Sequence, residues 1–110
     1  MITVEVHRTK NHEYKGFSCI GHAEYATPGH PDIVCAAVSA LTIGTVNALE
    51  ALAGEKMTVS QNEETGFFKC DFEDALQEKS NFLMDSMVFS LENIRKEYGR
   101  KYLKVKIKEV

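Results

Sequence analysis

Hydrophobic and polar residues alternate at both ends of the chain. The alternation runs through residues 2–7 and returns in residues 103–108, where lysines separate the hydrophobic positions. A period of two residues is that of a β-strand with one face buried and the other in water. We therefore predict a strand near each end.

Two further patterns are typical of β-hairpins. Residues 14–21 follow a short polar turn, so they are expected to pair with the first strand. Residues 57–61 and 67–72 are separated by a turn-like segment that ends at Gly66. This second pair predicts another hairpin.

Two longer segments have the spacing of helices. Residues 32–53 carry hydrophobic or small side chains almost all the way round and are closed by Gly54. This pattern is typical of a helix that is buried, or that is partly buried by another subunit. The other segment is amphipathic and ends at Gly99, with hydrophobic residues at steps of three and four. Those residues are Leu83, Met87, Leu91, Ile94 and Tyr98.

The predicted order is strand, strand, helix, strand, strand, helix, strand. It favours an α+β two-layer sandwich in which a mixed or antiparallel sheet of about five strands is covered by two helices. A length of 110 residues, with 44% hydrophobic and 26% charged residues, fits one domain over residues 1–110. The hydrophobic runs are short, so we expect no membrane span, no signal peptide and a cytoplasmic location.

The charge of the chain argues against nucleic acid as its partner. The net charge is −3, and binding to a polyphosphate draws on an excess of cationic side chains. The basic residues are nevertheless unevenly placed, because five of the thirteen lie in the last eleven residues. These five are Arg100, Lys101, Lys104, Lys106 and Lys108.

The chain has three cysteines, Cys19, Cys35 and Cys70, at spacings of 16 and 35 residues. An odd number at these spacings matches neither a disulfide framework nor a paired zinc pattern, so we expect free thiols, no metal and no cofactor. Cys19 and Cys70 lie in strand patterns beside aromatic residues. We expect both of them in the core.

Residues 21–41 place His22 at a strand end and Cys35 at a helix start. Asp32 is a favoured N-cap and would make Cys35 the third helical residue; alternatively, Pro31 opens the helix and Cys35 lies two residues deeper. In the first turn, unpaired N–H groups and the helix dipole favour a thiolate and are placed to stabilise an oxyanion. Spacing alone, however, favours simple packing of Cys35, since free cysteine is among the most often buried residues.

The same segment resembles the signature of the Prp family of bacterial ribosomal-processing cysteine proteases. In that family a Gly-His pair and a downstream Asp-Ile-Val-Cys-Ala-Ala segment form the active site. Length and element order are similar across the rest of the chain. The resemblance rests on Gly21, His22, Ala23, Tyr25, Gly29, Asp32, Ile33, Val34, Cys35, Ala36, Ala37, Val38, Ser39, Ala40 and Leu41.

The resemblance implies that Cys35 is a nucleophile and that His22 activates it and later protonates the leaving amine. It also implies a substrate, the N-terminal extension of the twenty-seventh large-subunit ribosomal protein, and a homodimer. The alternative is a non-catalytic ribosome-associated or ribosome-assembly module. In that case Lys104, Lys106 and Lys108 contact RNA and Cys35 merely packs.

Three residues near the pair are candidates for supporting roles. Gly21 belongs to the Gly-His pair. Asp32 either orients His22 or only caps the helix, and capping is the commoner role. Ser39 lies one helical turn after Cys35, where it either supports the thiol or bonds to its own helix.

The loop between the strand and the helix adds two more candidates. Tyr25 is the residue expected to contact an extended substrate tail. His30 lies between Gly29 and Asp32, where the loop is one residue longer than the form typical of the family. It is a rival base, although the nearby glycine and prolines indicate a mobile loop tip.

Overall fold

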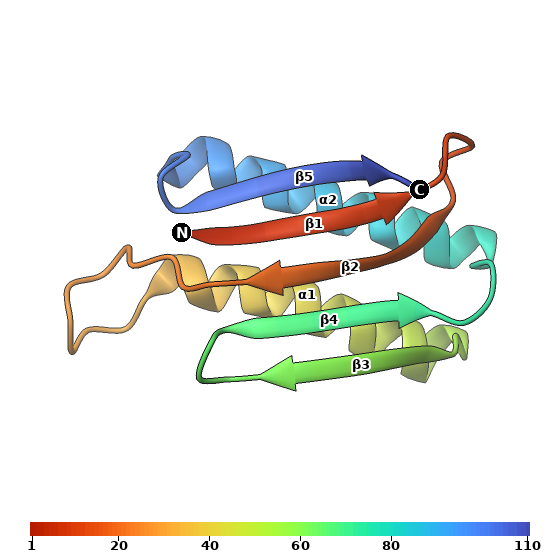
Figure 1. Ribbon diagram of the computed structural model, residues 1–110, viewed down its shortest axis with the longest axis horizontal. Coiled ribbons are helices and arrows are strands. Elements are labelled where there is room, and N and C mark those ends of the chain that lie inside the picture. The colour runs from red at the N-terminus through yellow and green to blue at the C-terminus, as the bar shows by residue number, and fades with distance from the viewer.

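A computed structural model describes all residues from Met1 to Val110. Its order of strands and helices is the predicted one, which confirms the fold class (Figure 1). The second helix begins earlier than its hydrophobic spacing indicates, because its first turn is polar. In chain order the elements are β1 (Ile2–Arg8), β2 (Tyr14–Ile20), α1 (Ile33–Ala53), β3 (Met57–Asn62), β4 (Phe67–Phe72), α2 (Glu78–Tyr98) and β5 (Leu103–Glu109).

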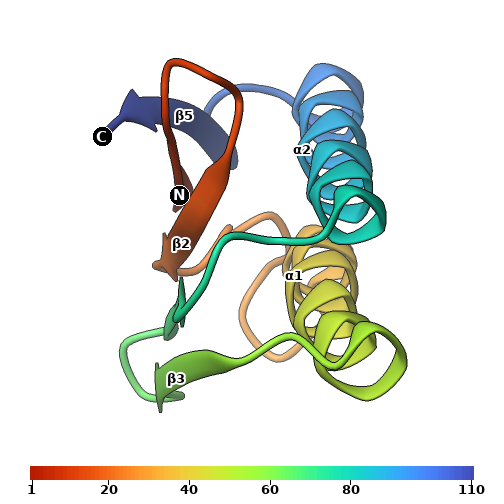
Figure 2. The same cartoon turned by 90° about the vertical axis from the view of Figure 1, so that its right-hand side faces the viewer.

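The five strands form one mixed sheet in the order β3-β4-β2-β1-β5. All neighbours pair antiparallel except β1 and β5, which are parallel with Val4 opposite Val105. Helix α1 connects β2 to β3, and α2 connects β4 to β5, so each helix crosses between two strands of the same direction. The crossover from β2 to β3 moves toward one edge of the sheet, and the crossover from β4 to β5 moves toward the other edge. Because β2 and β4 also point in opposite directions, two right-handed crossovers place both helices on the same face of the sheet. Figure 2 shows the resulting two layers.

The core lies between the sheet and the two helices. Alternate strand positions point into it, including Val4, Val6 and Phe17, which have no exposed surface. The helices contribute Leu49 and Leu91, which are buried to the same degree. Hydrophobic and polar residues therefore alternate along the strands because one face of the sheet is covered by the helices and the other is open.

Helix α1 is buried on one side only. The sequence favoured a helix buried on most sides, but Ala36, Ala40, Gly44 and Leu52 are exposed in this single chain. By length and composition, with a mean hydropathy of 1.6, α1 could also cross a membrane, so this measure does not support the expectation of no membrane span, which stays a prediction. Its valine, isoleucine and leucine residues are spaced among small residues, so the sequence shows no long run of large hydrophobic side chains. Here the helix covers one face of the sheet.

The basic strand lies at an edge of the sheet. Lys104, Lys106 and Lys108 of β5 are exposed and alternate with residues on the core side. The Nζ atom of Lys106 lies 3.5 Å from a carboxylate oxygen of Glu5 on the neighbouring strand. This pair offsets part of the positive charge of the strand.

A polar cluster ties the turn between β1 and β2 to α2. The Tyr14 hydroxyl and the His12 ring both bond to the Asp85 carboxylate. Burial, followed by the bond to Asp85, raises the pKa of Tyr14 to about 12. Burial alone would raise the pKa of Asp85, but the bonds from Tyr14 and His12, with the charges of His12 and Arg8, hold it below its ordinary value.

We predict that the Asp85 carboxylate stabilises the fold at neutral pH and that this contribution is lost in acid. A carboxyl pKa that is lower in the folded state gives stability above the unfolded pKa, and the contribution disappears as the pH falls through the folded value. Asp85→Asn should cost about 1 kcal/mol in urea unfolding at pH 7 and less at low pH. Asp74→Asn, at an exposed carboxylate without such bonds, is the control. Equal pH dependence of both variants would contradict the prediction.

Candidate active site

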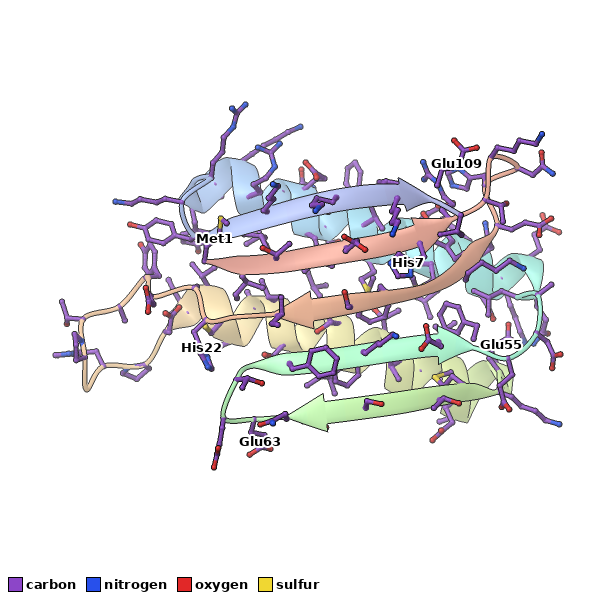
Figure 3. All side chains as sticks on the ribbon, viewed as in Figure 1. Met1, His7, His22, Glu55, Glu63 and Glu109 are labelled. Atoms are coloured by element: carbon purple, nitrogen blue, oxygen red, sulfur yellow. The ribbon has the colours of Figure 1, made fainter.

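His22 lies directly after β2, in the loop of residues 21–32 that leads into α1. Gly21 makes this exit possible, because its φ of 100° is strained for residues with a side chain. A Cβ atom at Gly21 would also lie 2.4 Å from the carbonyl oxygen of Met1. The chain therefore leaves the sheet close beside the start of β1 and presents an exposed His22 side chain at the end of β2 (Figure 3).

Asp32 anchors both the loop and the helix. Its Oδ1 atom accepts the backbone N–H groups of Val34 and Cys35, each over 3.0 Å. Its Oδ2 atom accepts those of Tyr25 and Ala26, over 2.9 Å and 3.4 Å. One carboxylate thus begins α1 and folds the loop back onto the first turn of the helix.

This geometry confirms Asp32 as the N-cap and Cys35 as the third helical residue. Burial alone would raise the pKa of Asp32, but the four backbone N–H groups that it accepts lower the pKa below its ordinary value. The carboxylate is therefore ionised at neutral pH. It makes no hydrogen bond to His22, so in this structure it acts on the backbone.

Cys35 combines packing with access to solvent. It is partly buried against the core cluster, and the backbone N–H of Ala23 donates to its Sγ atom over 3.2 Å. This donor comes from the residue after His22, so the loop brings the two predicted residues into one region. An N–H aimed at sulfur stabilises the thiolate over the thiol.

The other two cysteines are core residues, as predicted. Cys19 and Cys70 are buried free thiols. Burial, with smaller effects of Cys35 and Asp71, raises the pKa of Cys19 to about 11 and that of Cys70 to about 12. Of the three, only Cys35 is partly exposed.

The His22 ring does not hydrogen-bond to Cys35 in this structure. Its Nε2 atom lies 3.5 Å from the carbonyl oxygen of Glu64, in the turn between β3 and β4. Figure 3 shows His22 and Glu63 at the same end of the molecule. His22 is thus held by a segment far from it in sequence.

His22 and Cys35 together line two adjoining cavities. The first, of about 260 Å³, lies between the sheet and α1, and Phe68 and Ile43 are among its walls. The second, of about 450 Å³, is formed by the loop and includes Glu24. A chain that passes from one cavity to the other would pass the Cys35 sulfur.

The loop candidates have different surroundings. His30 lines the second cavity, and its Nδ1 atom is 3.0 Å from the Thr27 hydroxyl. Tyr25 lies outside both cavities and packs edge-on against Tyr98 and Tyr102, with ring centroids 5.4 Å and 5.0 Å away. Tyr25 therefore anchors the loop to the end of α2, and its contact with substrate stays a prediction.

Ser39 lines the first cavity and is exposed, with no hydrogen bond back to its own helix. A supporting role near the thiol stays a prediction. The sequence predicted that the N–H groups of the first helical turn stabilise an oxyanion. In the structure, Asp32 already accepts the N–H groups of Val34 and Cys35. The N–H of Ala23, beside the sulfur, is the donor that the sequence did not indicate.

Sequence reasoning predicted the turn between β3 and β4 but missed its place in the site. Glu63 and Gly66 line the first cavity, and Glu64 contacts His22. The sequence signalled a turn ending at Gly66, but no local pattern tells which distant residue a turn contacts. No group of three or more His, Cys, Asp or Glu side chains is arranged to hold a metal ion.

Comparison with known proteins gives one consistent result. The sequence profile of the family described as cysteine protease Prp matches residues 1–104. The chain is 34% identical over 102 residues to the ribosomal processing cysteine protease Prp of Bacillus subtilis strain 168, covering 89% of this chain and 90% of that protein. It is 36% identical over 101 residues to the protein of the same name from Staphylococcus aureus strain Mu50, covering 90% and 92%.

Solved structures agree with this result. The ribosomal processing protease Prp from S. aureus, in complex with a covalently linked product peptide, has a TM-score of 0.89 and 30% identity, covering 98% of this chain and 100% of that one. The S. aureus protease in complex with a substrate peptide has a TM-score of 0.85 and 29% identity, at the same coverage. Since the profile spans nearly the whole chain and a partly exposed cysteine shares two cavities with a histidine, the chain belongs to the cysteine protease Prp family.

Proposed function

We propose that this cysteine protease removes the N-terminal extension of the precursor of the twenty-seventh large-subunit ribosomal protein. The relatives from B. subtilis and S. aureus are ribosomal processing proteases, and S. aureus Prp has been seen with substrate and product peptides. The observation that carries the proposal is that Cys35 and His22 line both cavities. An extended tail lying across the two cavities would place a peptide bond at the sulfur.

In the proposed reaction, His22 takes the proton of the Cys35 thiol and the thiolate attacks the scissile carbonyl carbon. The tetrahedral oxyanion collapses to a thioester as the C–N bond breaks, and the imidazolium gives its proton to the leaving amine. His22 then removes a proton from water as the water oxygen attacks the thioester. The second tetrahedral intermediate collapses by breaking the C–S bond, the imidazolium returns its proton to the Cys35 sulfur, and the product acid gives its proton to solvent. The Ala23 N–H supports the thiolate at the start and end of the cycle.

The free site is not yet set for proton transfer, because the His22 ring and the Cys35 sulfur share no hydrogen bond. Catalytic hydrogen bonds are often long without substrate and tighten in the complex. We infer that the ring reaches the sulfur transiently in the free chain, and that a bound tail, by filling the two cavities, holds the two in contact. Gly21, Asp32 and Ser39 support this arrangement through the backbone turn, the loop anchor and the cavity wall.

The central test is cleavage of the purified precursor. The wild-type chain should release one N-terminal peptide, and mass spectrometry should find a single new N-terminus. Cys35→Ala should yield no product, and His22→Ala should cut at least ~100-fold more slowly, because general acid–base catalysis typically contributes that much. Cys70→Ala, which removes a buried thiol away from both cavities, should retain activity. An uncut precursor with the wild-type chain would contradict the proposal.

A second prediction concerns the reactivity of the three thiols in the folded protein. Iodoacetamide at neutral pH should modify Cys35 alone, since burial raises the pKa of Cys19 to about 11 and that of Cys70 to about 12. His22→Ala should slow modification of Cys35 at least ~10-fold, because its proton acceptor is gone.

The control for this experiment is His30→Ala, which removes the other histidine of the second cavity. It should leave the rate for Cys35 unchanged. Peptide mapping by mass spectrometry over time gives the rate at each cysteine. Equal slowing by both histidine variants would argue against His22 as the base, and an inert Cys35 would argue against a nucleophile.

We also propose that the chain forms a homodimer through its helical layer. Phe82 and Phe89 lie seven residues apart on α2 and are 62% and 69% exposed. The neighbouring helix α1 exposes small residues that include Ala40 and Gly44. Large hydrophobic groups next to a face that permits close approach are typical of an interface.

Sedimentation velocity tests the dimer. The wild-type chain should sediment as a dimer, whereas the double variant Phe82→Ser, Phe89→Ser should sediment as a monomer with its fold intact by circular dichroism. Glu97→Ser, at an exposed polar position of α2, should leave the dimer unchanged. A monomeric wild-type chain at all concentrations would refute this interface.

A further inference from the structure

We propose that the turn between β3 and β4, residues 63–66, positions His22 for catalysis. In this proposal the backbone carbonyl of Glu64 orients the imidazole ring, and Gly66 provides the space in which the ring lies. The proposal rests on the proposed role of His22 as the base. It gives the Cys-His pair a third, main-chain member.

The first support is the contact of the ring itself. The Nε2 atom of His22 lies 3.5 Å from the Glu64 carbonyl oxygen, and this is the only hydrogen bond of the ring. A carbonyl only accepts, so this contact is a hydrogen bond when Nε2 carries the hydrogen. A neutral imidazole has one N–H, which leaves the lone pair of Nδ1 to accept the proton of Cys35.

The second support is the close approach at Gly66. A Cβ atom there would lie 2.5 Å from the Gly21 carbonyl oxygen and 3.0 Å from Cε1 of His22. The φ of Gly66 is 65°, in the left-handed region that glycine adopts at little cost. The turn therefore packs directly against both the strand end and the ring.

The turn is also fixed from within. The Asn62 side-chain oxygen accepts the N–H of Glu64 over 3.0 Å, and the Glu63 carbonyl accepts the N–H of Gly66 over 3.3 Å. These bonds hold the peptide groups on either side of the Glu64 carbonyl. An acceptor held in this way orients the ring better than a free side chain would.

The side chain that competes for this role is already occupied. Both oxygens of Asp32 accept backbone N–H groups, so its carboxylate stays on the loop and the helix. When His22 takes the thiol proton, the bond from its Nε2–H to Glu64 becomes charge-assisted and therefore stronger. The carbonyl thus stabilises the imidazolium as well as the ring orientation.

The test compares two glycines in the same backbone conformation. Gly66 has a φ of 65° and Gly54 a φ of 68°, but a Cβ at Gly54 would meet nothing within 4 Å. Gly66→Ala and Gly54→Ala therefore carry a similar backbone strain, and only the first pushes on the Gly21 carbonyl and the His22 ring. Both are assayed with the wild-type chain, below their unfolding temperatures.

We expect Gly66→Ala to lower kcat by about 10- to 100-fold, since a small misplacement of a catalytic group has effects of this size. It should also slow alkylation of Cys35 by iodoacetamide, a probe too small to depend on peptide binding. Gly54→Ala should match the wild-type chain in both assays. Equal behaviour of the two variants would overturn the proposal.

A measurement on the wild-type chain keeps the proposal testable if Gly66→Ala fails to fold. The ¹⁵N chemical shifts of the His22 imidazole above its titration should report the Nε2–H tautomer, and a dominant Nδ1–H tautomer would overturn the proposal. Failure of the proposed function looks different: the wild-type chain would leave the precursor uncut. The tautomer and the alkylation rates would still decide whether the turn positions His22.

Discussion

The site depends on one carboxylate that holds two segments of backbone together. Asp32 accepts two N–H groups from the first turn of α1 and two from the loop before it. These bonds decide where the helix begins, and so which turn carries Cys35. They also fold the loop back so that the Ala23 N–H donates to the Cys35 sulfur. Because the accepted N–H groups keep the carboxylate ionised, the anchor is present throughout the neutral pH range.

The histidine reaches the site by a different route. It leaves the end of β2 through Gly21 and meets the turn between β3 and β4, which follows it by some forty residues in sequence. The proposed nucleophile and the proposed base thus rest on separate supports, and both line the same two cavities. This separation gives a physical reason for a site that is incomplete in the free chain, and incompleteness would limit unwanted proteolysis before a proper substrate is bound.

The surroundings of Cys35 are compatible with both packing and its proposed catalytic role. It packs against the core cluster, as a small hydrophobic residue would, and its sulfur still borders two cavities. Cys19 and Cys70 have the same chemistry but lie deeper, where burial keeps them protonated. Partial exposure at a helix start distinguishes Cys35 from the two buried thiols. The lysines of β5 lie apart from both cavities, and membership in a protease family favours the enzymatic interpretation over the RNA-binding module.

Local patterns in the sequence determined the strands, the helices and their order, because periods of two and of three to four follow from one buried face on each element. They also determined the N-cap at Asp32 and the place of Cys35, since a cap acts within one turn of its own helix. The exposure of one face of α1 and the contact of His22 with the turn at Glu64 were decided only by the tertiary structure. Each of these depends on which distant segments meet across the sheet, and no local period or spacing encodes such a meeting.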